Sequence, residues 1–277
     1  MSEPPVVVVG AGPQGLAAAA HLVERGQEVV VLERGASVAA AVAEWGQVRL
    51  FSGWPELVDG AAQRLLERTG WVAPDSGYPT GDEWIDRYLA PLAAALGDRV
   101  RTGLTVTGIT RAGRDLVVDS GRAEAPFLVH TLDADGGEGR LSARAVIDAS
   151  GTWSQPNPAG ADGLPALGVR AAGDRVSYRI PHDVSSHAGT HVVVVGAGNS
   201  AAHAVLRLTE LARTAPGTRV TWVLRRGSTG SVFGGGAGDG LPERAALGIR
   251  ARRAMEKGLV EVFTGFRVAE LRPHPEG

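Results

Sequence analysis

The sequence Val6-Val7-Val8-Val9-Gly10-Ala11-Gly12 returns later in the chain as Val192-Val193-Val194-Val195-Gly196-Ala197-Gly198. Four consecutive valines are typical of a strand that is buried on both faces of a parallel sheet. In each copy a glycine turn, an alanine- and leucine-rich helix and a second apolar strand follow. The predicted helices and second strands are Leu16–Arg25, Ala201–Arg213, Glu28–Leu32 and Arg219–Leu224. The repeat therefore predicts an α/β fold with two Rossmann-like domains built on parallel sheets.

The sequence outside these two units carries weaker signals. Residues 36–80 indicate loops with short helices, and Gly81–Leu96 is predicted as a helix because it has an acidic start. Polar, glycine-rich turns separate three short apolar runs, which predicts a small antiparallel meander. These runs are Thr105–Thr110, Phe127–Leu132 and Arg140–Ala145. A further buried strand is predicted at Ala145–Ala149 and a further helix at Pro242–Lys257. The loop Phe233–Gly240 is interpreted either as a mobile lid or as an ordinary flexible loop.

The composition is that of an ordinary globular protein, with 44% hydrophobic and 21% charged residues and a formal net charge of −2. There is no arginine- or lysine-rich run and no apolar stretch of roughly 18 residues. We therefore expect no nucleic-acid partner, no membrane and a cytoplasmic location. The chain has no cysteine, which excludes thiolate metal sites and a redox dithiol on these 277 residues. The histidines lack metal-ligand spacing, so no metal is expected.

The first glycine turn, Gly10-Ala11-Gly12-Pro13-Gln14-Gly15, fits G-x-G-x-x-G at the junction of a strand and a helix. In that context the first glycine permits a tight turn, the second lets the backbone approach a pyrophosphate, and the third lets helix and strand pack closely. Glu33, at the end of the second strand, is placed to accept hydrogen bonds from an adenosine ribose. A glycine turn that only packs the helix is the alternative. The candidate residues are Gly10, Gly12, Pro13, Gln14, Gly15, Glu33 and Arg34.

The second glycine turn, Gly196–Ala201, has the form G-x-G-x-x-A, and its unit differs from the first after the second strand. There Val31-Leu32-Glu33 corresponds to Val223-Leu224-Arg225. A carboxylate suits the free 2′-hydroxyl of FAD, whereas a guanidinium binds the 2′-phosphate of NADPH in bidentate fashion. The repeat therefore predicts FAD in its first unit and NADPH in its second, unless the arginines are solvated surface charges. The candidate NADPH residues are Gly196, Gly198, Asn199, Ser200, Ala201, Arg225 and Arg226.

Four stretches together resemble the flavin-containing monooxygenase group within the pyridine-nucleotide-dependent FAD flavoproteins. They are Gly10–Gly15 with Glu33, Asp148–Ser154, Gly196–Ala201 and Arg225–Arg226. Asp148-Ala149-Ser150-Gly151 is similar to the D-A-T-G segment of that family, which implies that Gly151 lies near FAD. Gly198-Asn199-Ser200 is similar to the family's G-N-S motif for NADPH. The Baeyer–Villiger signature F-x-G-x-x-x-H-x-x-x-W is missing from the region Tyr178–His191.

The resemblance also implies a domain organisation. Residues 1–158 would form the first part of an FAD domain, 159–187 a linker and 188–277 an NADPH domain. In such proteins a final segment returns to cover the flavin, and we expect this segment to be absent because few residues follow Leu271.

Three residues are candidates for contact with the flavin ring, because they lie where the family often lines it. Trp45 would stack near the ring, and Arg49 or Ser52 would hydrogen-bond it. A packed surface loop is the alternative for this segment. No catalytic residue is identified from the sequence.

Two dinucleotide sites on one chain imply hydride transfer from NADPH to FAD. Since the chain has no cysteine pair to receive the electrons, oxygen is the favoured acceptor. We therefore predict an NADPH-dependent flavin monooxygenase acting on a nitrogen, sulfur or carbonyl centre of a small-molecule substrate. An oxidoreductase that reduces a quinone or a protein is one alternative, and a truncated, non-catalytic dinucleotide-binding module is another. A homo-oligomer is left open.

Overall fold

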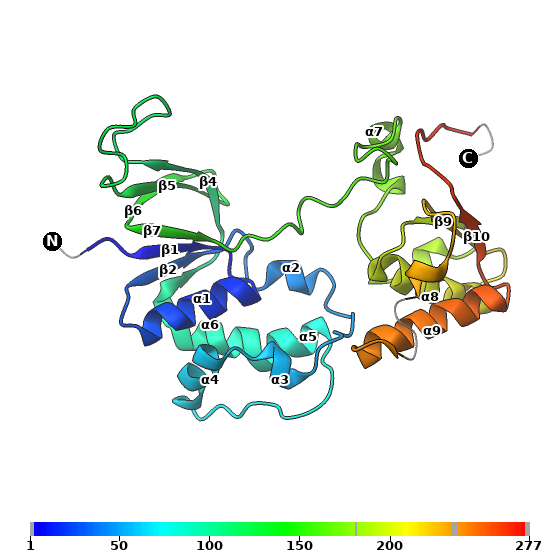
Figure 1. Cartoon of the computed structure of the whole chain (residues 1–277), viewed down its shortest axis with the longest axis horizontal. Helices are drawn as coiled ribbons and strands as arrows, with labels where there is room; N and C mark the ends of the chain where they lie inside the picture. The colour runs from blue at the N-terminus through cyan, green and yellow to red at the C-terminus, as the bar shows by residue number, and fades with distance from the viewer. Residues whose placement is uncertain (1–2, 181, 234–237, 275–277) are drawn as a thin grey trace. The chain divides into compact units, whose positions relative to one another are not determined.

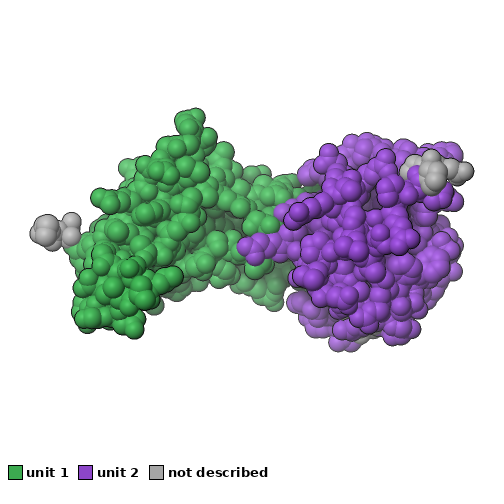
Figure 2. Space-filling model, turned by 90° about the horizontal axis from the view of Figure 1, so that it is seen from above, with its two compact units in different colours: residues 1–154 green, residues 155–277 purple. Residues whose placement is uncertain are grey.

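The computed structural model describes residues 3–180, 182–233 and 238–274. The chain folds into two compact units, Met1–Ser154 and Gln155–Gly277, which Figure 2 shows in different colours. Each unit contains one copy of the repeated strand–turn–helix–strand sequence. The predicted α/β class with parallel sheets is therefore confirmed.

A four-stranded parallel sheet forms the centre of the first unit, with the strand order β3-β2-β1-β7; Figure 1 labels β1, β2 and β7. Its strands are β1 (Val6–Val9), β2 (Val29–Leu32), β3 (Val100–Arg101) and β7 (Ala145–Asp148). β1 lies between β2 and β7 and pairs with both along its whole length. Val6, Val7 and Val8 are buried, as predicted for a valine run that has both faces covered.

Helices cover one face of this sheet. α1 (Pro13–Glu24) joins β1 to β2 and packs against α4 (Gly60–Glu67) and α6 (Ala90–Leu96). The helix α1 begins at Pro13 rather than at the predicted Leu16, because the fixed φ of proline and its missing N–H suit the first helical position. The shorter helices of the unit are α2 (Ala40–Ala43), α3 (Trp54–Leu57) and α5 (Gly81–Trp84).

The predicted helix Gly81–Leu96 is helical throughout. It consists of α5, a π-helical turn η1 (Ile85–Leu89) and α6. Thr80 starts the segment with a capping box, in which its hydroxyl accepts a hydrogen bond from the Glu83 N–H and the Glu83 carboxylate accepts one from the Thr80 N–H. A short 3₁₀ turn, η2 (Gly97–Arg99), then leads into β3.

The opposite face of the parallel sheet is covered by an antiparallel sheet with the order β4-β5-β6. Its strands are β4 (Leu104–Arg111), β5 (Phe127–Asp133) and β6 (Glu138–Ala143), and they confirm the predicted meander. Val129 and Ala143 pack against Val7 and Leu32, and all four side chains are buried. The valines of β1 are thus enclosed between helices and meander.

The second unit contains a three-stranded parallel sheet with the order β10-β9-β8. Its strands are β8 (His191–Val195), β9 (Arg219–Leu224) and β10 (Glu261–Thr264). α8 (Asn199–Thr214) joins β8 to β9, and α9 (Pro242–Glu256) joins β9 to β10 and packs beside α8. Both helices agree closely with their predicted ranges, although α8 already begins at Asn199.

The prediction that the second valine run is buried on both faces is wrong. Val193 is 52% exposed and Val195 is 43% exposed. Val193 corresponds in the repeat to Val7, which the meander covers in the first unit. β8 is an edge strand, and among the described residues of the second unit no sheet covers that face. Identical strand sequences therefore have different burial because their surroundings differ.

The first part of the second unit, before β8, forms short helical turns. It contains α7 (Val169–Ala172), η3 (Gly173–Arg175) and η4 (Ser185–His187). The Ala161 N–H donates to the Val268 carbonyl (2.9 Å), and the Leu271 N–H donates to the Leu167 carbonyl (2.7 Å). The first half of the predicted linker is thus hydrogen-bonded to the last described residues.

The predicted glycine-rich loop Phe233–Gly240 is described only at its two ends, since residues 234–237 lie outside the described residues. It follows the 3₁₀ turn η5 (Gly230–Val232). In the described ranges, no helix is long and apolar enough to cross a membrane.

Candidate dinucleotide-binding sites

The first glycine turn connects β1 to α1 with very little free space. Gly10 has φ of +98°, a conformation that favours glycine, and its N–H donates to the Leu32 carbonyl (2.7 Å). A Cβ added to Gly15 would lie 1.9 Å from the Gly10 carbonyl oxygen, and one added to Gly10 would lie 2.7 Å from that of Ala149. These two glycines are therefore required by packing, as the motif predicts.

Gly12 differs from its neighbours because it faces open space. A Cβ added there would meet no atom within 4 Å. The first backbone bond of α1 runs from Leu16 to Gly12 (3.0 Å), so the N–H groups of Gln14 and Gly15 lie before it, at the free end of the helix. Pro13 occupies the first helical position. Open space beside free N–H groups and the positive end of a helix dipole fits a pyrophosphate.

Glu33 supports this turn from the end of β2. One carboxylate oxygen accepts a hydrogen bond from the Ala11 N–H and the other accepts one from the Gly35 N–H, both at 2.8 Å. The residue is only 9% exposed. Each carboxylate oxygen has a second lone pair, so Glu33 can brace the turn and still accept a ribose hydroxyl. The sequence indicated the ribose contact but not the brace. Arg34 is exposed beside it.

The segment after β7 lies directly beside the first turn. The Ala149 N–H donates to the Val9 carbonyl (2.9 Å), which continues the pairing of β7 with β1. The Ser150 hydroxyl (2.6 Å) and N–H (3.0 Å) both donate to Asp148, and these bonds lower the pKa of the Asp148 carboxyl. Gly151 follows with φ of +67° and open space around it. The structure thus places Gly151 close to the Gly10 turn.

The three candidates for the flavin ring lie in one segment of the first unit. The Trp45 ring packs against Gly81, where an added Cβ would come within 3.1 Å of it. The Arg49 guanidinium donates to the Tyr78 carbonyl and lies 3.9 Å from the Glu83 carboxylate. Ser52 is half-buried in the following bend. Trp45 and Arg49 therefore hold this segment to residues 78–83, which fits the alternative of a packed loop as well as a flavin contact.

The second glycine turn has the same backbone form as the first but a different environment. Gly196 has φ of +125°, and its N–H donates to the Val223 carbonyl (3.0 Å). The buried Trp222 indole donates to the Gly196 carbonyl (2.8 Å). The Gly196 carbonyl is thus held by an aromatic side chain. In the first unit the corresponding Gly10 carbonyl is packed against Gly15 instead. The sequence gave no signal for this hydrogen bond.

The N-terminus of α8 also faces open space. A Cβ added to Gly198 would meet no atom within 4 Å, and the first backbone bond runs from Ala202 to Gly198 (3.2 Å). The N–H groups of Asn199, Ser200 and Ala201 precede that bond. This end of α8 therefore fits a pyrophosphate in the same way as the first turn.

Arg225 and Arg226 lie at the same edge of the sheet, directly after β9, and both are exposed. The Arg225 guanidinium donates to the Ala161 carbonyl (3.1 Å), which leaves other N–H groups of its fork for a ligand. The Arg226 carbonyl accepts a bond from the Gly265 N–H (2.8 Å), which anchors its backbone. β8 and β9 are parallel neighbours, so the glycine turn and the two arginines meet at the carboxyl ends of adjacent strands.

One ion pair that sequence reasoning missed holds the start of α9. Arg244 and Asp239 are joined at 2.6 Å, and the Asp239 side chain is 1% exposed. Asp239 also accepts a hydrogen bond from the Leu241 N–H (3.0 Å). No group of His, Asp and Glu residues in the described ranges could hold a metal ion.

Residues 7–232 match the family model described as pyridine nucleotide-disulphide oxidoreductase, so the chain belongs to that family. Members of this family use FAD and NAD(P)H. The predicted resemblance and the predicted class of cofactors are thereby confirmed.

The similar proteins include oxygenases and disulfide reductases. The chain is 33% identical over 199 residues to indole-3-pyruvate monooxygenase YUCCA1 of Oryza sativa subsp. japonica, a match that covers 71% of this chain and 43% of the rice protein. Among solved structures, bacillithiol disulfide reductase Bdr of Bacillus cereus has a TM-score of 0.74 at 21% identity, covering 99% of this chain and 71% of that one. Ornithine hydroxylase PvdA of Pseudomonas aeruginosa has a TM-score of 0.67 at 17% identity, covering 100% and 76%. The chain thus spans less than half the length of its rice relative.

Proposed function

We propose that this protein is an NADPH-dependent FAD monooxygenase that oxygenates a nitrogen, sulfur or carbonyl centre of a small molecule. The observation that carries the proposal is the pair of open glycine turns, one followed by the carboxylate of Glu33 and the other by the guanidinium of Arg225. FAD supplies the redox chemistry when bound, by accepting a hydride from NADPH and passing the electrons to oxygen.

The first unit is proposed to bind FAD. The N–H groups at the start of α1 would hold its pyrophosphate above Gly12, and Glu33 would accept hydrogen bonds from the ribose. Trp45, Arg49, Ser52 and Gly151 are the proposed residues on the flavin side. In this proposal the FAD domain comprises residues 1–158, followed by the connecting segment 159–187.

Residues 188–277, which lie within the second unit, are proposed to bind NADPH rather than NADH. The start of α8 would hold the pyrophosphate above Gly198. Arg225 and Arg226 would bind the 2′-phosphate, because a guanidinium fork matches the geometry of a phosphate and has no advantage with a 2′-hydroxyl.

Two observations support oxygen as the electron acceptor. The chain has no cysteine to form a redox dithiol. Its similarity to a plant monooxygenase extends over 71% of its length. A small-molecule substrate and a cytoplasmic location belong to the same proposal.

The second candidate is an oxidoreductase that passes electrons to a quinone or to another protein. The structural similarity to a disulfide reductase favours it, since the fold serves both types of acceptor. A dinucleotide-binding module without catalytic activity is the third reading.

The experiment that tests these candidates begins with the absorption spectrum of the purified protein, which reveals a bound flavin. Oxidation of NADPH and NADH is then followed in air and under argon, with a quinone added in the argon series. Dependence on oxygen supports the monooxygenase, and activity with the quinone under argon supports the second candidate. Absence of flavin binding under FAD saturation would leave only the third.

A further inference from the structure

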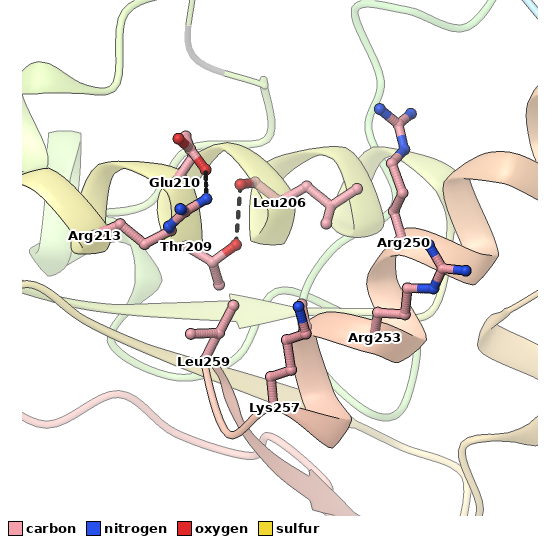
Figure 3. Close-up of a pocket in the computed structure, with 9 residues that line it drawn as sticks. Leu206, Thr209, Glu210, Arg213, Arg250, Arg253, Lys257 and Leu259 are labelled. Atoms are coloured by element: carbon pink, nitrogen blue, oxygen red, sulfur yellow. Dashed lines mark hydrogen bonds and ion pairs between the residues drawn. The ribbon is translucent and has the colours of Figure 1, made fainter.

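A hollow of about 200 Å³ lies between α8 and α9 in the second unit (Figure 3). Apolar and small side chains form its floor, and four cations form its rim. The floor residues are Leu206, Thr209 and Ala254, Leu259 lies exposed at the edge, and the rim cations are Arg213, Arg250, Arg253 and Lys257. In Figure 3 the Lys257 side chain extends from α9 towards α8.

The positive charge of the rim is largely uncompensated. Glu210 is the acidic residue of the lining, and its carboxylate pairs with Arg213 at 3.0 Å. No described carboxylate forms an ion pair with Arg250, Arg253 or Lys257. Arg250 and Arg253 lie on α9 and Lys257 is its C-cap residue. Their spacings of three and four residues place them on one side of the helix.

The hollow is separate from the proposed NADPH site. The glycine turn Gly196–Gly198 lies at the N-terminus of α8, whereas Leu206, the first lining residue on that helix, lies eight residues after Gly198. At 1.5 Å per residue this is about 12 Å along the helix axis. A dinucleotide pyrophosphate held at the start of α8 therefore leaves the hollow free.

We propose that this hollow binds a compact organic anion with at least two negative charges, namely a phosphate monoester with an apolar body. The phosphate lies among Arg250, Arg253 and Lys257, and the apolar body rests on Leu206 and Leu259. The volume is below the range of drug-sized ligand pockets, which limits the ligand to a small molecule. Because the cations are exposed, the attraction weakens as salt concentration rises.

The test uses the 277-residue chain with ¹³C-labelled leucine methyl groups, phenyl phosphate as the probe and inorganic phosphate as the charge-only comparison. The methyl signals of Leu206 and Leu259 report binding inside the hollow, whereas binding at a glycine turn moves other signals. We expect saturable shifts of both methyl signals with phenyl phosphate, and at least tenfold weaker binding of inorganic phosphate.

The variants are Arg253→Gln/Lys257→Gln and, as matched control, Arg252→Gln. Arg252 is an exposed cation of the same helix, but its guanidinium lies over the Phe233 ring, 5.1 Å from the ring centre. We expect the double variant to bind phenyl phosphate at least tenfold more weakly while its remaining methyl spectrum stays that of the folded protein. Equal affinity of the wild type and the double variant, or an equal loss in Arg252→Gln, would overturn the proposal. So would phenyl phosphate shifts confined to leucines outside the hollow.

Discussion

Glu33 has two roles in the first glycine turn, and they can be separated by experiment. Its carboxylate braces Ala11 and Gly35 in the protein alone and is proposed to bind the ribose of FAD. Glu33→Gln removes the charge and one acceptor oxygen. We expect it to weaken FAD binding by about 1.5–3 kcal/mol, the size of a charged hydrogen bond. A flavin fluorescence titration measures this effect.

The control for Glu33 is Glu28→Gln, because Glu28 is an exposed acid just before the same strand. Urea unfolding of both variants shows how much of the effect comes from stability. If Glu33→Gln lowers stability but leaves FAD affinity unchanged, Glu33 is only a brace for the turn.

Arg225 determines the choice of nicotinamide cofactor in this proposal. Arg225→Gln is expected to weaken NADPH binding by about 1.5–3 kcal/mol, or roughly ten- to a hundredfold, and to leave NADH binding nearly unchanged. Arg219→Gln is the matched control, because Arg219 is an exposed arginine at the other end of β9. Isothermal titration with both cofactors is the measurement. Equal affinity of the native protein for NADPH and NADH would remove Arg225 from this role.

At the level of the turn and its helix, alanine substitutions at two glycines of one motif are predicted to have different effects on stability. Gly15→Ala places a Cβ 1.9 Å from the Gly10 carbonyl oxygen, so α1 must shift, at a cost of about 1–3 kcal/mol of stability. Gly12→Ala places its Cβ in open space, so stability is retained while the methyl group occupies the position proposed for the pyrophosphate. We expect both variants to lose FAD binding and only Gly15→Ala to unfold at lower urea. A stable Gly12→Ala variant with native FAD affinity would show that the pyrophosphate lies elsewhere.

The two valine strands provide a matched pair of elements. Val7→Thr introduces a hydroxyl between helices and meander, where Val7 has no exposed surface, and should cost about 1–3 kcal/mol. Val193→Thr changes the equivalent residue of the repeat, which is 52% exposed, and should change stability by less than about 0.5 kcal/mol. Urea unfolding measures both. Similar losses in the two variants would show that the face of β8 is covered in solution.

For the whole molecule, the sequence predicted the fold best where short local motifs are sufficient to specify it. The valine runs, the glycine turns and the positions of Glu33 and Arg225 specify two Rossmann units because each feature has meaning within a few residues. The hydrogen bond from Trp222 to Gly196 and the brace from Glu33 to Ala11 were not predicted. Both depend on side-chain directions that the chain acquires only after it folds.

The prediction that β8 is buried on both faces was wrong for a related reason. A valine run shows that a strand is apolar enough to be buried. Whether it is buried depends on covering elements that come from distant parts of the chain. In the first unit β5 and β6 supply Val129 and Ala143 for this purpose. A repeated motif therefore predicts the local unit well and its surroundings poorly.

The last prediction concerns the fate of the electrons. A monooxygenase consumes one oxygen molecule per NADPH and places one oxygen atom in the substrate and the other in water. We expect the FAD-loaded chain to oxidise NADPH only in the presence of oxygen and to transfer ¹⁸O from ¹⁸O₂ to an amine, thioether or ketone in a substrate panel. Mass spectrometry of the products and an oxygen electrode provide the measurements, and Arg225→Gln, tested at an NADPH concentration below saturation, is the control for specific cofactor use. NADPH oxidation under argon that accelerates with a quinone, together with no ¹⁸O in any product, would instead establish the oxidoreductase. Release of all the oxygen as hydrogen peroxide would instead show that these 277 residues reduce oxygen without shielding the flavin from water, because a water-exposed flavin loses its oxygen before it reaches a substrate.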